Sequence, residues 1–309
     1  MSISLGTWPT PVDLMPRCAR TLGLGADDLW IKRDDVTGLG GGGNKIRKLQ
    51  YTCAQAVALG ATTLITSGAP QSNHARLTAA AAARLGLRCI LVLRGTRPET
   101  MQGNLVLDAV VGADIVWAGQ TDTDSVIAEA GDSVVRSGGI PFVIPFGGTS
   151  AVAAQGYVDC AREIEQQIPG FDRVVVAVGS GGTMAGLVAH LGADRVIGVD
   201  VGAVSDPVST VAGLLDEMPG PAVRSGNLRI VRDQVGQGYS TLTDGSSRAI
   251  RHLARTEGIF LDPTYTGRAF AGLMNLVEDN VIAAGTTTVF LHTGGLPGLF
   301  GHAELSTLL

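Results

Sequence analysis

Hydrophobic residues along this chain form short continuous runs, which alternate with longer stretches where apolar positions recur every three or four residues. Short apolar runs rich in β-branched residues are typical of buried strands, and the longer periodic stretches are typical of helices. The predicted strands cover residues 29–32, 62–66, 89–93, 115–117, 142–144, 174–178, 196–201 and 287–291. The predicted helices cover residues 45–59, 72–85, 101–111, 124–135, 151–167, 182–190, 244–256 and 267–279.

Strands and helices therefore alternate over most of the chain. This order is typical of parallel sheets covered by helices, because parallel strands need long crossover connections. A length of 309 residues suggests about two domains. We therefore expect an α/β fold with two open, mostly parallel twisted sheets flanked by helices. In such sheets, ligands bind outside the carboxyl ends of the strands, where loops lead into helices.

The composition narrows the classes of partner. The formal net charge is −5 and the chain has no run of Lys or Arg, which argues against a nucleic-acid partner. No apolar run approaches the ~18 residues that a membrane span needs, and the first residues do not form a signal peptide. The cysteines, Cys18, Cys53, Cys89 and Cys160, lack metal-ligand spacing. We expect no metal site, reduced thiols and a cytoplasmic location.

The first segment with candidate chemistry is a run of glycines that leads into a lysine. Gly40 to Gly43 leave bare backbone against which a flat ligand can lie, and Asn44 and Lys45 follow them. Lysine is the side chain that forms Schiff bases, and burial lowers its pKa enough to make it nucleophilic. The alternative is a flexible loop ahead of a solvated basic helix.

The second segment is a buried strand that runs into a glycine-rich turn and then a helix. The turn contains Gly179, Ser180, Gly181, Gly182 and Thr183. Backbone amides at a helix N-terminus bind phosphate well, and the hydroxyls add donors. A tight structural turn is the plain alternative. A dinucleotide site is another, because Asp200 follows about twenty residues later, but the glycine spacing differs from the dinucleotide pattern.

The third segment joins a predicted strand to a predicted helix through Gln71, Ser72, Asn73 and His74. Ser72 or Asn73 could simply cap the helix. The functional interpretation is that these side chains and the first amides of the helix bind a substrate carboxylate.

Together, these segments resemble the fold-type II enzymes that use pyridoxal 5′-phosphate (PLP), the tryptophan-synthase-β-like group. The resemblance is closest to the family of 1-aminocyclopropane-1-carboxylate deaminase and D-cysteine desulfhydrase. The family motifs appear in order as Gly42 to Leu49, Gln71-Ser72-Asn73, Gly179 to Gly182, Gly238-Tyr239, Asp262-Pro263-Thr264-Tyr265 and His292-Thr293-Gly294-Gly295.

The resemblance implies a role for each position. Lys45 would hold PLP as a Schiff base and then move the α-proton of a small amino-acid substrate. Ser72, Tyr239 and Tyr265 complete the catalytic set. The implied cofactor-binding residues are Lys45, Asn44, Asn73, Gly179, Ser180, Gly181, Gly182, Thr183, Thr266, Thr293 and Gly294. The implied substrate-binding residues are Ser72, Asn73, His74, Gln71, Tyr239 and Tyr265.

Two positions favour the desulfhydrases within this family. In the family, the residue after the tyrosine that Tyr265 matches faces the pyridine nitrogen. The deaminases have Glu there and the desulfhydrases have Thr, which this chain resembles with Thr266. A hydroxyl leaves the ring nitrogen closer to neutral, which suits β-elimination better than ring opening. His74 also resembles the desulfhydrases, since the deaminases usually have Gln.

The resemblance therefore implies a β-eliminating lyase that converts D-cysteine, or a similar amino acid, to pyruvate, ammonia and sulfide. The alternatives are the cyclopropane deaminase, a cysteate or serine lyase, a nicotinamide-dependent dehydrogenase, and a PLP-fold protein that only binds a ligand. The implied architecture has a large PLP-binding domain at 1–50 and 158–309 and a smaller inserted domain at 51–157. A homodimer is implied by the resemblance alone.

Overall fold

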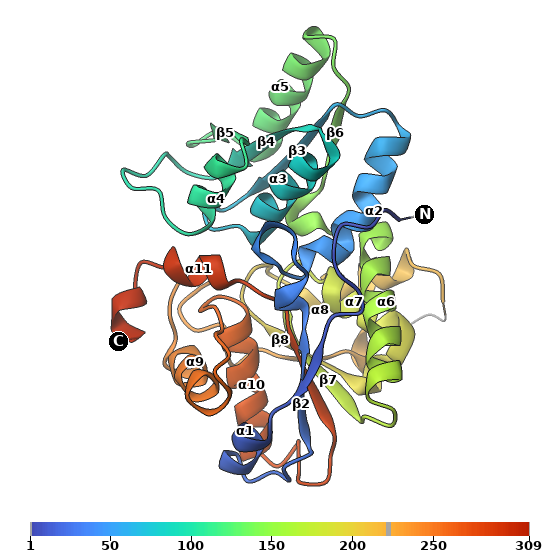
Figure 1. The fold of residues 1–309 in the computed structure, drawn as a ribbon, viewed down its shortest axis with the longest axis vertical. Helices are drawn as coiled ribbons and strands as arrows, with labels where there is room; N and C mark the ends of the chain where they lie inside the picture. Colours follow the sequence, from blue (N-terminus) through green and yellow to red (C-terminus); the bar gives the residue numbers. More distant parts are fainter. Residues whose placement is uncertain (1, 221–223, 309) are drawn as a thin grey trace.

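The strands of the chain form two separate sheets, as the computed structural model shows for residues 2–220 and 224–308 (Figure 1). The six-stranded sheet has the order β1-β2-β10-β7-β8-β9, and the four-stranded sheet has the order β5-β4-β3-β6. Within the described residues, every strand pair is parallel except β1 with β2. The prediction of two open, mostly parallel sheets is confirmed.

The elements of the six-stranded sheet come from both ends of the chain. Its strands are β1 (Val12–Leu14), β2 (Leu29–Arg33), β7 (Arg173–Val178), β8 (Val196–Asp200), β9 (Arg229–Val231) and β10 (Thr288–His292). Its helices are α1 (Pro16–Thr21), α6 (Ala151–Gln167), α7 (Gly182–Leu191), α8 (Pro207–Asp216), α9 (Asp244–Glu257), α10 (Thr266–Glu278) and α11 (Leu296–Phe300).

Both faces of this sheet are buried, as expected for a parallel sheet. Val174 and Val176 of β7 pack among α6, α7 and α8. Val175 and Ala177 point the opposite way and pack among α1, α9 and α10. The continuous apolar run of β7 thus supplies both cores, because successive side chains of a strand point to opposite faces.

The four-stranded sheet is formed by the middle of the chain and lies above the larger sheet in Figure 1. Its strands are β3 (Thr63–Gly68), β4 (Arg88–Leu93), β5 (Asp114–Trp117) and β6 (Pro141–Val143). Helices α2 (Lys45–Ala58), α3 (Asn73–Leu85) and α4 (Asn104–Val110) pack with one face, and α5 (Thr123–Arg136) packs with the other.

The α3 helix shows how the sequence sets the bounds of these elements. The Ser72 Oγ accepts a hydrogen bond from the Ala75 amide (3.1 Å) and so caps the N-terminus. Gly86 ends the helix in the left-handed conformation (φ 71°), which a glycine adopts without strain. Residues 79–82 are alanines and are buried, so the helix packs closely against the sheet.

Pattern analysis missed two short strands at the sheet edges and three helices, α1, α8 and α11, of which α8 has ten residues. Strands β1 and β9 have three residues each and occupy the two edges of the larger sheet. Helix α4 begins at Asn104 and not at residue 101, because Gly103 has a positive φ of 54° and ends the preceding loop.

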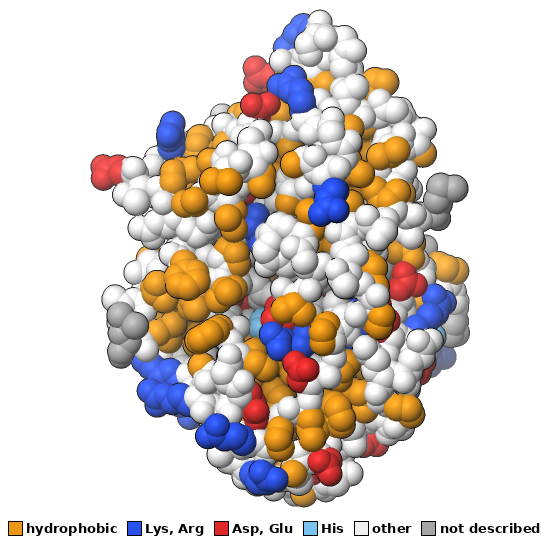
Figure 2. Space-filling view, in the orientation of Figure 1, with side chains coloured by type: hydrophobic (Ala, Val, Ile, Leu, Met, Phe, Trp, Pro, Cys, Tyr) orange, Lys and Arg blue, Asp and Glu red, His pale blue; other side chains and the backbone are white. Residues whose placement is uncertain are grey.

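The surface agrees with the acidic composition. In the face that Figure 2 shows, basic side chains are scattered among acidic and polar ones and form no continuous stripe. Among the described helices, none is both long and apolar enough to cross a membrane.

Candidate active site

Two adjoining cavities lie where the carboxyl ends of β3 and β7 approach each other. Together with the open solvent at their mouths, the first encloses about 420 Å³ and the second about 840 Å³. The first is lined by Asn44, Lys45, Lys48, Asn73, Ala177, Gly179, Ser180, Gly181, Thr183, Tyr265, Thr293 and Gly294. The second is lined by Lys45, Ala69, Ser72, His74, Arg94, Phe146, Gly147, Ser180, Gly202, Ala203, Tyr239 and Tyr265. Most of the predicted site residues are therefore brought together.

Lys45 lies at the junction and lines both cavities. It is the first residue of α2, so its side chain leaves the helix next to the glycine loop. Burial lowers the pKa of Lys45 to about 8, because the charged amine loses solvation without gaining an acidic partner. A lower pKa leaves more of the amine neutral near pH 7, and the neutral amine is the nucleophile.

The loop before Lys45 requires glycine at position 42. Gly42 has a φ of 76°, and a Cβ there would lie 1.9 Å from the Asp35 carbonyl oxygen. Arg76 of α3 donates to the carbonyl oxygens of Gly40 and Gly42. The Asn44 amide donates to the Thr293 carbonyl (3.0 Å). The loop is thus held from the small sheet on one side and from β10 on the other.

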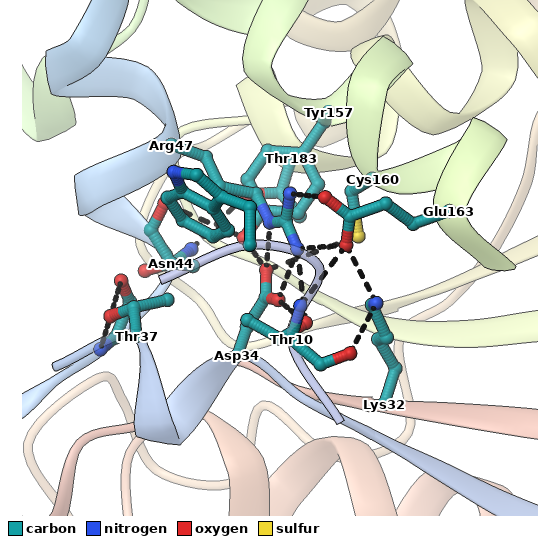
Figure 3. Close-up of polar contacts among 12 residues, drawn as sticks. Thr10, Lys32, Asp34, Thr37, Asn44, Arg47, Tyr157, Cys160, Glu163 and Thr183 are labelled. Carbon is teal, nitrogen blue, oxygen red and sulfur yellow. Dashed lines mark hydrogen bonds and ion pairs between the residues drawn. The ribbon is translucent and has the colours of Figure 1, made fainter. Parts of the chain in front are cut away.

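A buried network of ion pairs and hydrogen bonds holds Arg47, which lies in the first turn of α2 together with Lys45 (Figure 3). Arg47 donates to Asp34 (2.8 Å) and to Glu163 (2.7 Å), and Lys32 also donates to Glu163 (2.7 Å). Tyr157 donates to Asp34 (2.7 Å). Because Arg47 is two residues from Lys45, this network restrains the backbone that carries the lysine.

The predicted glycine turn lies between β7 and α7, as expected for an anion site. The first amides of α7 have no intrahelical partner, as at every helix N-terminus. The Thr183 hydroxyl accepts from the Asn44 side chain (3.1 Å), and the Ser180 hydroxyl bonds Thr149 (2.6 Å). A Cβ at Gly182 would lie 2.9 Å from the Lys48 ammonium, so a side chain there would displace that cation from its present position.

Lys48 is a site residue that pattern analysis missed. It is 1 % exposed, and its Nζ donates to Thr149 (3.1 Å) beside the glycine turn. Burial and the nearby charge of Lys45 hold its pKa well below the usual range for lysine. A bound dianion would compensate this buried charge. The spacing of three residues from Lys45, which places both lysines on one helix face, is the signal that could have found it.

The third segment contributes three of its four predicted residues to the cavities. Ser72 and His74 line the second cavity, and Asn73 lines the first. His74 is buried, and its Nε2 bonds the Thr66 hydroxyl (2.9 Å). Burial and the charges of the two nearby lysines hold the pKa of His74 well below 6.5, so it is neutral.

Three of the predicted residues line neither of these cavities: Gln71, Gly182 and Thr266. The Gln71 Oε1 accepts from the Asn104 amide (2.9 Å) and its Nε2 donates to the Gln102 carbonyl (3.0 Å), so its amide holds a loop, and the residue lines a neighbouring cavity with Asn73, Tyr239 and Tyr265. Thr266, expected at the pyridine nitrogen, is also absent from both linings. Its hydroxyl donates to Asp262 (2.7 Å), because it lies in the first turn of α10.

The two predicted tyrosines meet in the second cavity. Tyr239 and Tyr265 pack edge to face with ring centroids 5.7 Å apart, and their hydroxyls form a short hydrogen bond with each other. Burial raises the pKa of both phenols. Both therefore stay protonated near pH 7, and either can donate a proton or relay one.

Asn104, which pattern analysis also missed, orients the third segment. It is fully buried at the start of α4. Its Nδ2 donates to the Gln71 carbonyl (3.0 Å) and to the Asn73 Oδ1 (3.1 Å). Because the Asn73 oxygen is used in this way, its amide NH₂ group is left to donate into the first cavity. Asn104 is a positioning residue for Asn73.

Replacing Asn104 with Ala should therefore weaken cofactor binding by roughly 10-fold, since one hydrogen bond to a buried polar group contributes about 1–2 kcal/mol. The dissociation constant can be measured by titrating the cofactor-free protein and following visible absorbance. Asn275→Ala is a matched control, because the Asn275 amide bonds Asp233 at the surface (2.7 Å). Unchanged affinity in Asn104→Ala would contradict the positioning role.

The fold and the two cavities define an α/β enzyme that binds a phosphorylated, carbonyl-bearing cofactor beside a lysine. Residues 3–294 match the family of pyridoxal-phosphate dependent enzymes. The chain belongs to this family, and its cofactor is PLP. This membership confirms the resemblance found in the sequence and excludes the nicotinamide-dependent alternative.

Individual relatives cover nearly the whole chain. A protein of Pyrococcus abyssi with the provisional name 1-aminocyclopropane-1-carboxylate deaminase is 39% identical over 321 residues, covering 98% of this chain and 94% of that protein. D-cysteine desulfhydrase of Salmonella schwarzengrund is 40% identical over 310 residues, covering 95% of this chain and 94% of that protein.

Solved structures agree with these relatives. The crystal structure of an ACC deaminase homologue has a TM-score of 0.89 and 38% identity, covering 100% of this chain and 96% of that chain. The processed form of threonine deaminase isoform 2 from Solanum lycopersicum has a TM-score of 0.66 and 19% identity, covering 97% of this chain and 82% of that chain. The second likeness supports the fold alone.

The residues present fit PLP. A phosphate dianion needs several donors and a nearby positive charge, and the first cavity offers the amides of α7, the hydroxyls of Ser180 and Thr183, and the Lys48 ammonium. An aldehyde needs a nucleophilic amine, and Lys45 lies in the same cavity with a lowered pKa.

Proposed function

We propose that this chain is a β-eliminating lyase that converts D-cysteine and water to pyruvate, ammonia and sulfide. The observation that carries the proposal is the position of Lys45, which lines both the cavity with the phosphate donors and the cavity with Ser72 and the tyrosine pair. The relative from Salmonella schwarzengrund that is named D-cysteine desulfhydrase supports the same substrate.

Lys45 would hold the cofactor through its amine, with the glycine turn and Lys48 at the phosphate. Asn73, positioned by Asn104, would donate to the phenolic oxygen of the ring. Bound PLP supplies an electron sink, which stabilises the charge that develops when an amino acid loses its α-proton. Lys48 is the weaker candidate for the covalent link, because it lines only the first cavity.

The second cavity would hold the amino acid. The Ser72 hydroxyl and the free amides of Asn73 and His74, the first two of α3, form a donor set for the α-carboxylate. Lys45 would remove the α-proton as a general base. The pair of Tyr239 and Tyr265 would donate a proton to the departing sulfur, since both hydroxyls stay protonated at neutral pH.

The second candidate is the cyclopropane deaminase, which the Pyrococcus abyssi relative and the ACC deaminase homologue favour. The lining of the first cavity favours elimination instead, since it contains hydroxyl and amide side chains and, among the described residues, no Asp or Glu. A ring nitrogen without a carboxylate partner makes PLP a weaker electron sink. Besides Ser180 and Thr183, assigned to the phosphate, and Tyr265, the remaining hydroxyl in this lining is that of Thr293, and Thr266 is not part of the lining. Cysteate and serine remain alternative substrates for elimination.

Product analysis tests the proposal. Purified holoenzyme is supplied in turn with D-cysteine, L-cysteine, cysteate, D-serine and 1-aminocyclopropane-1-carboxylate. We expect equal amounts of pyruvate and sulfide from D-cysteine, at a higher kcat/KM than for the other substrates. Faster release of 2-oxobutanoate from the cyclopropane substrate would overturn the assignment in favour of the deaminase.

We also propose the domain organisation, the assembly and the location that the sequence implied. A smaller domain at 51–157 would close over a larger one at 1–50 and 158–309, and bring Ser72 towards Lys45. The four-stranded sheet, between Thr63 and Val143, supports an inserted domain, although the proposed bounds fall within α2 and α6. A homodimer remains a proposal from family resemblance. The buried, unpaired cysteines support a reducing cytoplasm.

A further inference from the structure

The first turn of α10 contains a buried cation, Arg268, which lies three residues after Tyr265. Its side chain is fully buried, and within residues 2–220 and 224–308 it forms no ion pair with an acidic side chain. Burial lowers the pKa of Arg268, but a guanidinium stays charged at neutral pH. Because burying a charge without compensation is costly, the groups that Arg268 contacts indicate its role.

Backbone carbonyl groups compensate this charge. The Arg268 guanidinium donates four hydrogen bonds, to the carbonyl oxygens of Val201 (2.7 Å), Val235 (3.1 Å), Gly238 (2.6 Å) and Thr241 (2.7 Å). Val201 directly follows β8, and the other three residues belong to segment 232–243. This segment joins β9 to α9, and all its described residues lie outside helices and strands. The cation therefore ties segment 232–243 to the carboxyl end of β8, next to Gly202 of the second cavity.

Arg268 holds segment 232–243 more tightly than the backbone of the segment does. Within the segment, the Gly238 amide donates to the Val235 carbonyl and the Thr241 amide donates to the Gly238 carbonyl, both at 3.4 Å, which is long for a hydrogen bond. The bonds from Arg268 to the same two carbonyls are shorter (3.1 Å and 2.6 Å), and a charged donor makes them stronger. The conformation of the segment is therefore set by a side chain of α10.

Tyr239 lies between two of the residues that Arg268 holds, Gly238 and Thr241. Its hydroxyl meets the hydroxyl of Tyr265, the residue before α10, in the second cavity. One turn of α10 thus positions both tyrosines: Tyr265 directly, and Tyr239 through Arg268. The cation also acts on Tyr239 electrostatically, since burial raises the pKa of this phenol and the charge of Arg268 acts in the opposite direction.

We propose that Arg268 is a positioning residue that places the Tyr239 hydroxyl for proton donation to the leaving group and favours the phenolate that the donation leaves behind. The inference rests on the proposed β-elimination. When the Cβ–S bond of D-cysteine breaks, its electron pair stays on sulfur and HS⁻ takes the phenol proton, so hydrogen sulfide departs. The phenolate then regains a proton from water, and the step needs no oxidant or reductant.

Two substrates that differ in their need for a proton test this role. Chloride leaves β-chloro-D-alanine without a proton, whereas HS⁻ is the more basic leaving group and departs more readily when a phenol protonates it. Pyruvate release from both substrates is measured with wild-type and Arg268→Gln holoenzyme. We expect Arg268→Gln to lower kcat/KM about 10- to 100-fold for D-cysteine and less than about 3-fold for β-chloro-D-alanine, since a positioned general acid contributes roughly 10²–10⁴-fold.

Further variants separate this role from a contribution to the fold. Tyr239→Phe should show the same difference between the two substrates, and adding Arg268→Gln to it should cause no further selective loss, because both changes remove one function. Arg268→Lys keeps the charge but reaches fewer carbonyl groups, so it should recover part of the activity, and it carries the comparison if Arg268→Gln does not fold.

Arg251→Gln is the matched control, because Arg251 also donates to backbone carbonyls, those of Thr307 (2.7 Å) and Leu308 (3.3 Å), and lines neither cavity. It should change kcat/KM for either substrate by less than about 2-fold.

Hydrogen exchange of the holoenzyme gives a readout that does not depend on turnover. The amides of segment 232–243 should exchange at least about 5-fold faster in Arg268→Gln than in the wild type, and Tyr239→Phe should leave their exchange unchanged. Equal losses for the two substrates, no loss for either, or unchanged exchange in Arg268→Gln would each overturn the role of Arg268. If the wild type releases no pyruvate from either substrate, the proposed function fails instead.

Discussion

Replacing Lys45 with Ala is expected to lower turnover by about 10³-fold or more. Two contributions are lost together: the amine that holds the cofactor, and the general base, which alone contributes roughly 10²–10⁴-fold. The fold should survive, because Lys45 lies at the rim of two cavities and has no ion-pair partner among the described residues. Pyruvate release measures the loss, and circular dichroism checks the fold.

The position of the covalent link can be read directly, because the chain has only three lysines, Lys32, Lys45 and Lys48. Borohydride reduction of the holoenzyme should fix the cofactor to Lys45 alone, as a mass increase on one peptide. Lys32 is buried and paired with Glu163 (2.7 Å), which makes it a poor nucleophile. Lys48 is the real rival, since its pKa is also lowered.

Two further results bear on the role of Lys45. An added small amine such as ethylamine should restore part of the activity of Lys45→Ala, which a variant damaged only in its fold would not show. A label on Lys48, or full activity in Lys45→Ala, would contradict the assignment. In either case the lysine at the phosphate end of the first cavity would have to carry the chemistry.

The parts of this site that local sequence patterns identified are those in which function and local structure share a cause. At Gly179–Thr183, the change from a strand through glycines to a helix produces the turn, and the same change exposes the backbone amides that bind an anion. The same holds for Lys45, which follows four glycines at the start of a helix. Such segments can be recognised within a dozen residues of sequence.

The residues that pattern analysis missed or misplaced depend on contacts between distant segments. Asn104 acts on Asn73 from 31 residues away, and Lys48 meets Thr149 from 101 residues away. Gln71 stands within a recognised motif, yet its amide turns to the loop that ends at Gly103. Nothing local separates a glutamine that binds a substrate from one that holds a loop.

The buried network behind α2 also could not be predicted locally, and it should dominate the stability of the region. Asp34 accepts from Arg47, from the Thr10 hydroxyl (2.8 Å) and from the Tyr157 hydroxyl. Asp34 and Glu163 balance the charges of Arg47 and Lys32 (Figure 3). Removing Asp34 leaves Glu163 alone to balance the two positive charges of Arg47 and Lys32.

We expect Asp34→Ala to lower the free energy of unfolding by about 3–5 kcal/mol, the usual cost of breaking a buried ion pair from one side. Asp114→Ala is the matched control, because Asp114 and its partner Arg88 are both exposed, and such a pair contributes less than about 1 kcal/mol. Urea unfolding of both variants measures the difference. Asp34→Asn, which keeps the shape, covers the case in which Asp34→Ala does not fold, and should lose at least 1 kcal/mol.

The same network predicts a pH dependence of stability. The Arg47 guanidinium, opposing the effect of burial, lowers the pKa of Asp34 and that of Glu163 below their ordinary values. A carboxyl group with a lowered pKa in the folded state stabilises the protein above its unfolded pKa, which is about 4, and this contribution is lost as the pH falls below that value. The wild type should therefore lose stability steeply below about pH 4, and Asp34→Asn should lose less over the same range. Parallel curves for the two proteins, or a loss in Asp34→Ala no larger than in Asp114→Ala, would show that the network does not stabilise the helix that carries Lys45.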